Sequence, residues 1–261
     1  MTKTSIIIPT YNGLTLLKTC IESIRSHTVD EQYEIIIVDN GSTDGTAKYC
    51  IHEQLTFVSL PTNIGFPKAC NIGISIASGD QLLLLNNDII CTPHWLSNLT
   101  QALSSSPDIG IVGPSSNYVN GLQQVEVTYS SLEEFQQIAA LNNSLDPSRW
   151  LEVQRITGLC FLFKREVLNR VGLLDEAFSP GHYEDDDYCF RARSRGYRLL
   201  VCRDVLLYHE GSVSFKASYA PEEIEALVDR NYQLFVDKWH IDPHQFIDSW
   251  IRTNPEGGEV Q

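Results

Sequence analysis

Polar and acidic side chains stand at three places where an apolar run of the chain ends. Residues 9–13 follow one run, residues 39–45 follow a second, and residues 86–88 follow a third. In open α/β sheets, ligands bind outside the carboxyl ends of the strands, so such positions are candidates for a binding site. Turns are polar in any protein, and Ser42 or Asp44 can simply cap a helix. Three such segments at one edge of a sheet nevertheless favour a ligand site.

Asp88 follows the apolar run Leu82–Leu85, so its carboxylate is expected to emerge from a buried strand at this edge. A hard divalent cation can bind such a carboxylate together with a diphosphate. As an isolated turn residue, Asp88 would be unremarkable. Together with the other polar segments, it predicts a metal and diphosphate site.

Four consecutive acidic residues, Glu184–Asp187, lie at the predicted start of a helix, where the helix macrodipole favours negative charge. Helix capping accounts for one or two of them. Four adjacent carboxylates repel one another, which either raises a pKa or recruits a cation, and both outcomes are typical of functional sites.

Two basic side chains are weaker candidates. His209 ends an apolar strand pattern before a turn-like segment, where a lone histidine is more often an ordinary hydrogen-bonding residue than a metal ligand. Lys68 lies in the first turn of a predicted helix. It is either solvated or a phosphate contact supported by that helix N-terminus.

The scaffold that positions these residues begins with an alternation of short apolar runs and helical patterns over residues 1–114. This alternation is typical of βαβ units around a mostly parallel sheet, and the unbroken apolar runs predict strands covered on both faces. Thr92 is a candidate N-cap. The predicted strands are Ser5–Pro9, Tyr33–Val38, Leu55–Leu60, Gln81–Leu85 and Ile109–Val112, and the predicted helices are Gly13–His27, Asp44–Glu53, Pro67–Ala77 and Pro93–Leu103.

The rest of the chain is less regular. Residues 115–150 are rich in Ser, Asn and Gln, and we interpret them as an insertion with one short helix at Leu132–Leu141. A terminal Gly/Glu segment is expected to fray. The further predicted elements are an apolar run at Ile156–Phe163, helices at Lys164–Arg170, Glu184–Arg195, Pro221–Lys238 and Pro243–Trp250, and a strand pair within Tyr197–Tyr208.

Composition limits the classes of function. The chain has 261 residues with 43% hydrophobic content, enough for one large α/β domain or two small ones. Its 19 basic and 33 acidic side chains give a net charge of −14, which disfavours nucleic acids and anionic membranes as partners. A phosphate ligand therefore needs a local cation or a helix N-terminus.

The seven cysteines form no C-x-x-C pair and no zinc-like spacing. They are predicted to be reduced, mostly buried thiols. No run approaches the roughly 18 apolar residues that a transmembrane helix needs. The sequence therefore predicts a cytoplasmic protein without a transmembrane segment, and leaves peripheral contact at the inner face of a membrane open.

Taken in order, these segments resemble the family 2 inverting glycosyltransferases, including bacterial rhamnosyltransferase-like members. The resemblance runs from about Ser5 to Ser214 and is weaker across residues 115–150. It is carried by the segments Ser5–Asn12, Ile37–Asp44, Asn63–Asn71, Leu82–Asp88 and Val171–Glu176, by Gly158, by Glu184 and Asp185 with Asp187 and Arg191, and by His209 with Ser212.

The resemblance implies a GT-A fold, in which helices flank a mostly parallel central sheet. A nucleotide-sugar-binding half (residues 1–114) and an acceptor half (residues 151–220) would flank the variable insertion 115–150 within one domain spanning residues 1–240. C-terminal helices and a tail would occupy residues 221–261.

The resemblance also assigns roles to residues. Asp39 would accept a hydrogen bond from a pyrimidine N3–H, and Asp88 and His209 would bind Mn²⁺ or Mg²⁺ across the donor diphosphate. The donor would contact Pro9, Thr10, Tyr11, Asn12, Asp39, Gly65, Phe66, Lys68, Asn86 and Asn87, and the acceptor would contact Thr157, Gly158 and Glu184.

In this scheme Asp185 is the general base that takes the proton of the acceptor hydroxyl during direct displacement, which needs no covalent intermediate. The family's metal motif is often Asp-x-Asp, whereas Asn86, Asn87 and Asp88 supply one carboxylate, so the metal site carries less charge. The pattern slightly favours a UDP- or dTDP-linked donor. The acceptor would be a glycan, lipid-linked glycan or protein hydroxyl, as in polysaccharide biosynthesis.

Other classes fit less well. A sugar-phosphate nucleotidylyltransferase needs a basic Gly-rich loop that residues 5–13 lack, and the glycine motifs of dehydrogenases and P-loop enzymes are absent from the strand ends. An inactive carbohydrate-binding subunit is disfavoured because Asp39, Asp88, Asp185 and His209 are all present. The sugar and the acceptor stay open, since the loops 115–150 and 211–220 would choose them.

Overall fold

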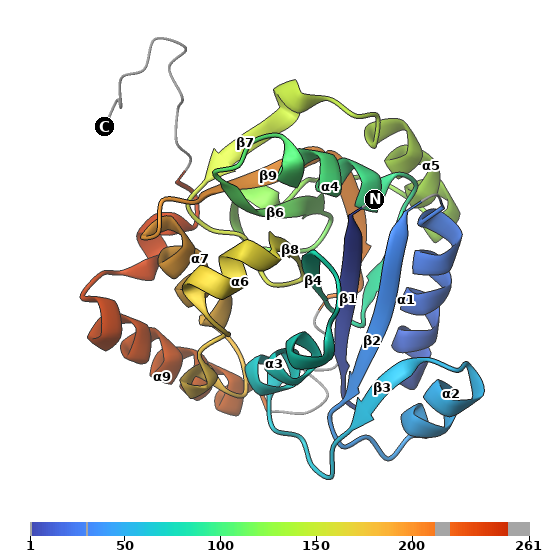
Figure 1. Cartoon of the computed structure of the whole chain (residues 1–261), viewed down its shortest axis with the longest axis horizontal. Coiled ribbons are helices and arrows are strands. Elements are labelled where there is room, and N and C mark those ends of the chain that lie inside the picture. The colour runs from blue at the N-terminus through green and yellow to red at the C-terminus, as the bar shows by residue number, and fades with distance from the viewer. Residues whose placement is uncertain (1, 30, 212–219, 250–261) are drawn as a thin grey trace.

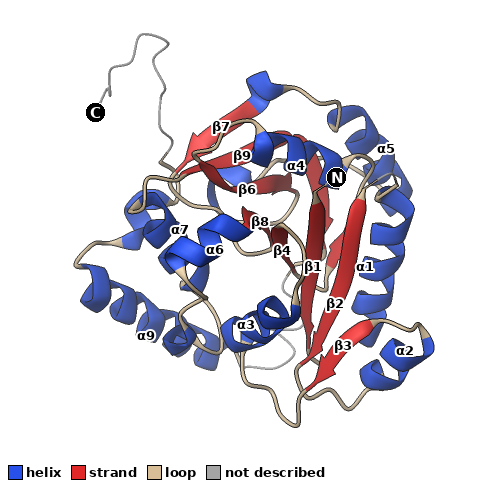
Figure 2. Cartoon of the chain, in the orientation of Figure 1, coloured by secondary structure: helices blue, strands red, loops and turns tan. Residues whose placement is uncertain are grey.

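The computed structural model describes residues 2–29, 31–211 and 220–249. Within these ranges, helices cover both faces of a nine-stranded mixed sheet (Figures 1 and 2). The predicted α/β architecture is confirmed.

The N-terminal half is the parallel part of the sheet. Its strands pair in parallel with one another, as the alternation of strands and helices predicted. The elements in order are β1 (Lys3–Thr10), α1 (Leu14–His27), β2 (Gln32–Asp39), α2 (Thr46–His52), β3 (Thr56–Ser59), α3 (Phe66–Ile76) and β4 (Gln81–Leu85).

The C-terminal half adds antiparallel pairing. Its elements are β5 (Ile89–Ile90), α4 (Trp95–Ser104), β6 (Ile109–Ser116), α5 (Leu132–Asn142), β7 (Trp150–Val153), β8 (Cys160–Lys164), α6 (Arg165–Val171), α7 (Glu184–Arg193), β9 (Arg198–His209) and α9 (Pro221–Trp239). Short 3₁₀ helices lie at Gly121–Gln123, Pro147–Arg149, Glu176–Phe178 and Pro243–Phe246. The strand order is β3-β2-β1-β4-β8-β6-β9-β5, and β7 also pairs with β9.

The core lies on both faces of the sheet, because successive side chains of a strand point to opposite faces. Along β1, Ile6 and Ile8 pack with α1 and α4, whereas Ile7 packs with α3 on the other face. All five residues of β4 are buried. Coverage of both faces explains why the strand runs are apolar without alternation.

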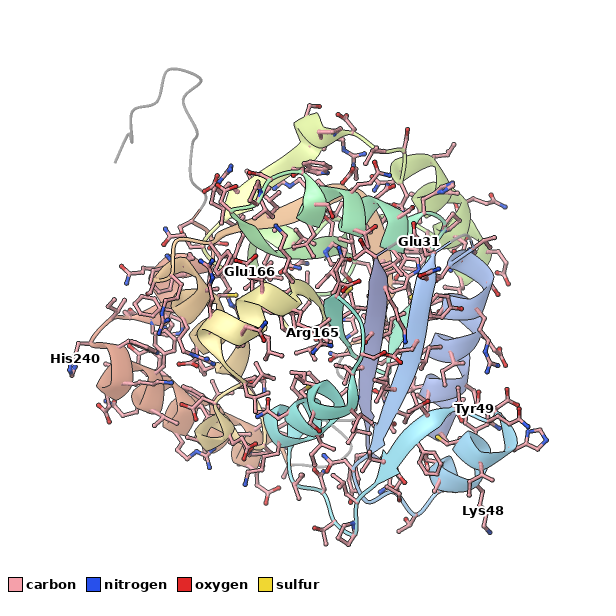
Figure 3. The ribbon with its side chains drawn as sticks, in the orientation of Figure 1. Glu31, Lys48, Tyr49, Arg165, Glu166 and His240 are labelled. Carbon is pink, nitrogen blue, oxygen red and sulfur yellow. The ribbon has the colours of Figure 1, made fainter. Side chains whose placement is uncertain are left out.

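Helices α6 and α9 are tied to the rest of the domain by cations. At the start of α6, Arg165 donates to the carbonyls of Gly79 and Ala77, and Figure 3 shows it between α6 and α3. Near the end of α9, Lys238 pairs with Asp187 of α7 at 2.6 Å. Beside that ion pair, Phe178, Phe235 and Phe246 form a small separate core.

Three local predictions are wrong. Tyr197–Tyr208 contains one long strand rather than a pair, because β9 pairs with β6 from Arg198 to Leu207 and with β7 from Leu199 to Cys202. Thr92 does not cap a helix: its hydroxyl donates to Leu206 O, and α4 begins at Trp95, beyond Pro93. In the predicted helix Pro243–Trp250, a 3₁₀ helix covers Pro243–Phe246, and Trp250 lies outside the described residues.

All seven cysteines are free and buried, as predicted. Across the described residues, each helix is too short or too polar to cross a bilayer. Ser212 and the loop 212–219, expected to influence the choice of acceptor, lie outside the described residues, as does the tail from residue 250.

Candidate active site

A cleft of about 430 Å³ opens at the carboxyl ends of β1 and β4 and the end of β9. Both halves of the chain contribute to it. The predicted site residues that line it are Pro9, Thr10, Tyr11, Gly65, Phe66, Asn86, Asn87, Asp88, Thr157, Gly158, Glu184, Asp185 and His209. Asn12, Asp39 and Lys68 are not part of its lining.

Asp88 and His209 meet in this cleft because β5 pairs antiparallel with β9, which places Ile89 opposite His209. Asp88 Oδ1 lies 3.2 Å from His209 Nε2, and both side chains are buried. His209 Nδ1 lies 2.6 Å from the carbonyl oxygen of Tyr118. A carbonyl can only accept, so Nδ1 carries a proton, and in the neutral form of the ring the lone pair would lie on Nε2, which faces Asp88.

This pair fits a divalent cation. A neutral Nε2 and a carboxylate oxygen are both acceptors, so their approach to 3.2 Å calls for a proton or a cation between them. The bond from Nδ1 to a backbone carbonyl is the usual support of a metal-bound histidine. Within the described residues, no group of three or more His, Cys, Asp or Glu side chains could hold a metal, so the further ligands would have to come from a diphosphate and water.

The strand ends behind the cleft are held by side-chain amides and hydroxyls. Asn87 Nδ2 donates to Thr10 Oγ1 at 2.8 Å, which joins the ends of β1 and β4. The buried Asp39 accepts from Ser42 N at 3.0 Å and from Ser59 Oγ at 3.0 Å. Its carboxylate therefore shapes the loop after β2.

Asn12 and Asp44 both hold backbone N–H groups of neighbouring segments. Asn12 Oδ1 accepts from Thr43 N at 2.8 Å. Asp44 accepts from Leu14 N and Thr46 N, the first residues of α1 and α2, so one carboxylate caps two helices. The helix-capping interpretation of Asp44 is therefore the one that its contacts support.

At Gly65 the N-terminal half packs closely against the segment before α7. Its φ is +89°, and a Cβ there would lie 2.7 Å from Pro180 Cα. Phe66 N donates to Pro180 O at 2.8 Å beside it. Any larger residue at position 65 would push the segment before α7 away from the N-terminal half.

The four acidic residues at the start of α7 are all buried, but they divide into two pairs. Asp186 lies 2.6 Å from Arg155 Nε, and Asp187 pairs with Lys238 and Arg191. Asp186 and Asp187 thus recruit cations from the protein itself. Glu184 and Asp185 line the cleft instead.

Asp185 is held by the backbone. Its Oδ2 accepts from Gly158 N at 2.8 Å, and its Oδ1 accepts from Asp186 N at 2.9 Å. Both oxygens act as acceptors, which is the role of an ionised carboxylate, and each keeps a further lone pair. The geometry therefore fixes a hydrogen-bond acceptor at the wall of the cleft.

The surroundings of Asp185 perturb its neighbours. Burial, reinforced by the charge of Asp185, raises the pKa of Glu184 well above its usual value. Burial also raises the pKa of Asp186 to about 7, although Arg155 opposes the shift. Glu184 Oε2 is buried without a hydrogen-bond partner among the described residues. A protonated Glu184 can donate to a hydroxyl group in the cleft.

Sequence reasoning missed Tyr118, Arg155, His182 and Tyr183, which also line the cleft. His182 and Tyr183 have φ of 72° and 69°, a conformation that is uncommon for residues other than glycine and clusters at functional sites. The position of His182 and Tyr183 directly before the acidic run Glu184–Asp187 could have identified them as site residues. Arg155 and Tyr118 gave none, because each stands alone in an irregular segment.

The strained turn is supported by the C-terminal helix. Asn231 of α9 is fully buried, and its Nδ2 donates to the carbonyls of Phe178, Gly181 and His182 at 2.7, 2.7 and 3.0 Å. Ile224 of the same helix reaches the cleft. Helix α9 therefore supports one wall of the cleft and contributes Ile224 to it.

Comparison with known proteins identifies relatives. The family described as glycosyl transferase family 2 matches residues 5–172, more than half of the chain. Among curated proteins, the chain is 26% identical to the O-antigen biosynthesis protein RfbC of Myxococcus xanthus, over 98% of this chain and 22% of that protein.

Two solved structures share the fold. One is the mannosyltransferase PcManGT from Pyrobaculum calidifontis, with GDP-Man and Mn²⁺ (TM-score 0.59, 23% identity, 80% of this chain and 56% of that one). The other is GalNAc-T7 with UDP, GalNAc and Mn²⁺ (TM-score 0.65, 17% identity, 80% and 44%). These likenesses show the GT-A fold. The chain spans less than two thirds of the length of each of these three proteins.

Proposed function

Because the chain belongs to glycosyl transferase family 2, we propose that it transfers a sugar from a nucleoside-diphosphate donor to a hydroxyl acceptor, with inversion at the anomeric carbon. One observation carries this proposal: the pair Asp88 and His209 and the carboxylate of Asp185 come from distant parts of the chain and line one cleft. Asp88 and His209 would supply a place for a diphosphate, and Asp185 would supply a base for a hydroxyl group.

The donor would lie along the strand ends of the N-terminal half. Pro9, Thr10 and Tyr11 line that side of the cleft, and Asp39 stands behind them with lone pairs for a pyrimidine N3–H. Asn86 and Asn87 would orient the donor from the end of β4. We propose UDP or dTDP as the nucleotide, and Asn12 and Lys68 as further contacts at the rim.

Asp88 and His209 would hold Mn²⁺ or Mg²⁺, which when bound offsets the negative charge of the leaving diphosphate. The two structural relatives solved with Mn²⁺ support a divalent metal. The backbone bond to Tyr118 O keeps Nε2 of His209 directed at Asp88.

The acceptor would enter from the side of α7, past Thr157 and Gly158. Asp185 takes the proton of the attacking hydroxyl, and the backbone N–H groups of Gly158 and Asp186 hold its carboxylate in place. Burial raises the pKa of Glu184 well above its usual value, and in its protonated form Glu184 would donate to the acceptor or to Asp185 and so fix the direction of attack. The net charge of −14 and the buried thiols support a cytoplasmic site of action.

Calorimetry with UDP, dTDP, GDP and ADP in Mn²⁺ tests the donor class. UDP or dTDP should bind most tightly, and Asp39→Ala should weaken that preference. Equal affinity for all four nucleotides would remove the role proposed for Asp39.

Release of UDP or dTDP from a panel of nucleotide sugars in Mn²⁺ tests the activity itself. A catalytically inactive carbohydrate-binding subunit, the alternative, would release no nucleotide from any of them. The anomeric configuration of the product, read by NMR coupling constants, tests inversion.

A further inference from the structure

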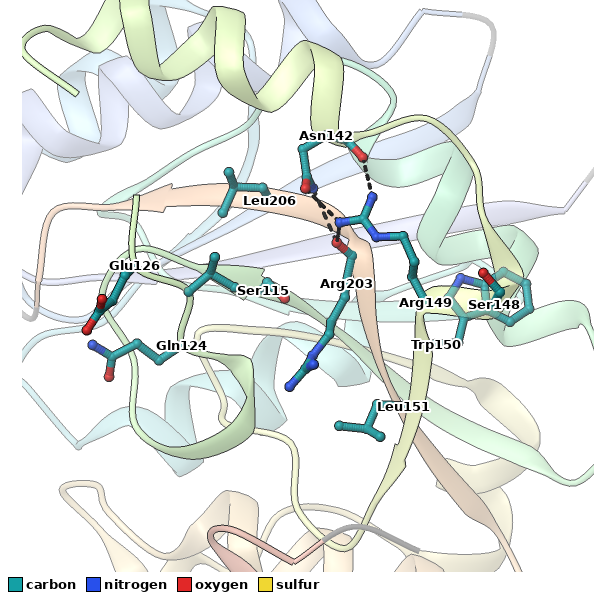
Figure 4. Close-up of a pocket in the computed structure, with 11 residues that line it drawn as sticks. Ser115, Gln124, Glu126, Asn142, Ser148, Arg149, Trp150, Leu151, Arg203 and Leu206 are labelled. Carbon is teal, nitrogen blue, oxygen red and sulfur yellow. Dashed lines mark hydrogen bonds between the residues drawn. The ribbon is translucent and has the colours of Figure 1, made fainter. Parts of the chain in front are cut away.

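A second groove, of about 660 Å³, lies between β6, β7 and β9 (Figure 4). We call it the distal groove, and Ser115, Gln124, Trp150, Leu151, Arg203 and Leu206 are among its walls. It shares no lining residue with the catalytic cleft. Its volume lies within the range of about 300–1,000 Å³ that is usual for ligand sites.

Strand β9 is irregular where it borders this groove. Pro114 of β6 pairs with Cys202, but the next residue, Ser115, pairs with Leu206. Residues 203–205 are therefore extra on β9 and form a bulge. Bulges next to functional sites commonly redirect a side chain.

The backbone and the acidic side chain of the bulge are held firmly. The carbonyl of Arg203 accepts from Asn142 Nδ2 at 3.3 Å and from the guanidinium of Arg149. The buried carboxylate of Asp204 accepts from Trp150 Nε1 at 3.0 Å and from Asp146 N at 3.0 Å. These hydrogen bonds involve the carbonyl of Arg203 and the carboxylate of Asp204. None of them involves the side chain of Arg203.

The guanidinium of Arg203 extends away from the bonds that hold its carbonyl, as Figure 4 shows. It is exposed and has no hydrogen bond or ion pair with any described residue, in a chain with 33 acidic side chains. At the floor, the buried hydroxyl of Ser115 also lacks a partner within the described ranges. Both are hydrogen-bonding groups offered to a ligand.

The chemistry of the walls matches a carbohydrate. Leu151, Leu206 and Trp150 provide apolar and aromatic surface for the C–H faces of a sugar ring. Arg203 and Gln124 provide planar donors and acceptors for hydroxyl groups. Glu126, which also lines the groove, and the net charge of −14 disfavour a polyanion such as a nucleic acid.

We propose that the distal groove binds the part of the acceptor glycan that lies away from the reacting hydroxyl. Two segments run from the groove to the cleft: Ser115 to Tyr118, and Leu206 to His209. The two ends of each segment are three residue steps apart, about 10 Å of extended chain, a length that a short oligosaccharide can span. The proposal rests on the proposed function, because it extends the acceptor site of that reaction.

A glycan microarray probed with labelled protein tests this proposal. The parent should bind a set of oligosaccharides, and Arg203→Ala should lower that binding about tenfold or more. Arg170→Ala, which removes an exposed arginine paired with Glu166 on α6, is the matched control and should bind like the parent. Leu151→Trp, which fills the groove, should act like Arg203→Ala. Melting temperatures close to that of the parent would show that these variants fold.

Three results would overturn the proposal: no glycan bound by the parent, equal losses in the two arginine variants, or binding that survives Arg203→Ala but is lost in Tyr118→Ala, which would place the glycan in the cleft. The array needs no donor and no turnover. It therefore separates failure of the groove from failure of the proposed transferase activity, which nucleotide release measures.

Discussion

The two ends of the parallel strands carry similar polar residues but use them differently. At the amino ends, Glu34 accepts from Lys3 Nζ, Ser5 Oγ and both the N–H and the hydroxyl of Ser78, at 2.6–2.9 Å. At the carboxyl ends, Glu184 leaves a buried oxygen without a partner among the described residues, and Asp185 accepts from two backbone N–H groups beside a cleft.

The difference separates a carboxylate whose hydrogen bonds are satisfied within the protein from one that keeps bonding capacity open at a cleft. The amino-end network satisfies its own carboxylate, so the pKa of Glu34 falls to about 2, although burial opposes its charge. On the α7 side of the cleft, burial and the charge of Asp185 raise the pKa of Glu184, although Arg155 opposes the shift. A buried polar group without a hydrogen-bond partner lowers the stability of the folded protein. A protein tolerates this cost at a cleft where a bound ligand supplies the missing hydrogen bond.

The largest effect is expected for Asp185→Asn, which keeps the shape of the base and removes its basicity. Turnover should fall by about 10²-fold or more, while the affinity for UDP in Mn²⁺ should scarcely change. Glu184→Gln should cost less, because an amide resembles the protonated carboxyl that the raised pKa favours. Near-parental transfer by Asp185→Asn, with Glu184→Gln or Asp187→Asn inactive, would assign the base to a neighbour.

The pair Asp88 and His209 gives the next effect. Asp88→Ala and His209→Ala should each weaken the binding of UDP in Mn²⁺ by roughly tenfold, equivalent to about 1.4 kcal/mol. In EDTA the parent and both variants should bind alike, because the metal carries the effect. If His209→Ala binds UDP and Mn²⁺ like the parent, the role of His209 is structural.

A smaller effect concerns stability at the cleft. The pKa of Glu184 is raised above its ordinary value of 4.5 in the folded chain, so the folded state holds a proton that the unfolded state loses as the pH rises. Its contribution to stability is complete below about 4.5 and is lost toward higher pH. Glu184→Gln lacks this loss and should gain stability relative to the parent from pH 5 to 8. Parallel curves in urea denaturation would contradict the raised pKa.

The smallest effect has the opposite sign and lies at the amino ends. The lowered pKa of Glu34 contributes stability above about 4.5 that is lost as the pH falls toward 2. Glu34→Gln should therefore be less stable than the parent near pH 7, by roughly 1 kcal/mol because the ion pair with Lys3 is partly exposed. The difference should shrink on acidification, and the affinity for UDP should stay at the parental value. A change in that affinity would break the contrast between the two ends.

Much of the fold followed from local sequence. The apolar runs of β1, β2 and β4 predicted strands that are buried on both faces, and the patterns between them predicted helices. Such burial can be predicted from the residues of the element itself. The polar residues after each run could be assigned to one edge, because parallel strands end on the same side. The sequence by itself therefore determined the α/β architecture and the place of the cleft.

Tertiary structure decided which side chains act together. The contact of His209 with Asp88 depends on the pairing of β5 with β9, and the ion pair of Arg155 with Asp186 depends on how an irregular segment crosses α7. The same applies to the bulge that directs Arg203 into the distal groove, since it exists only in the register of β9 against β6. Periodicity records whether a residue is buried, but strand register and the packing of distant segments decide what it is buried against.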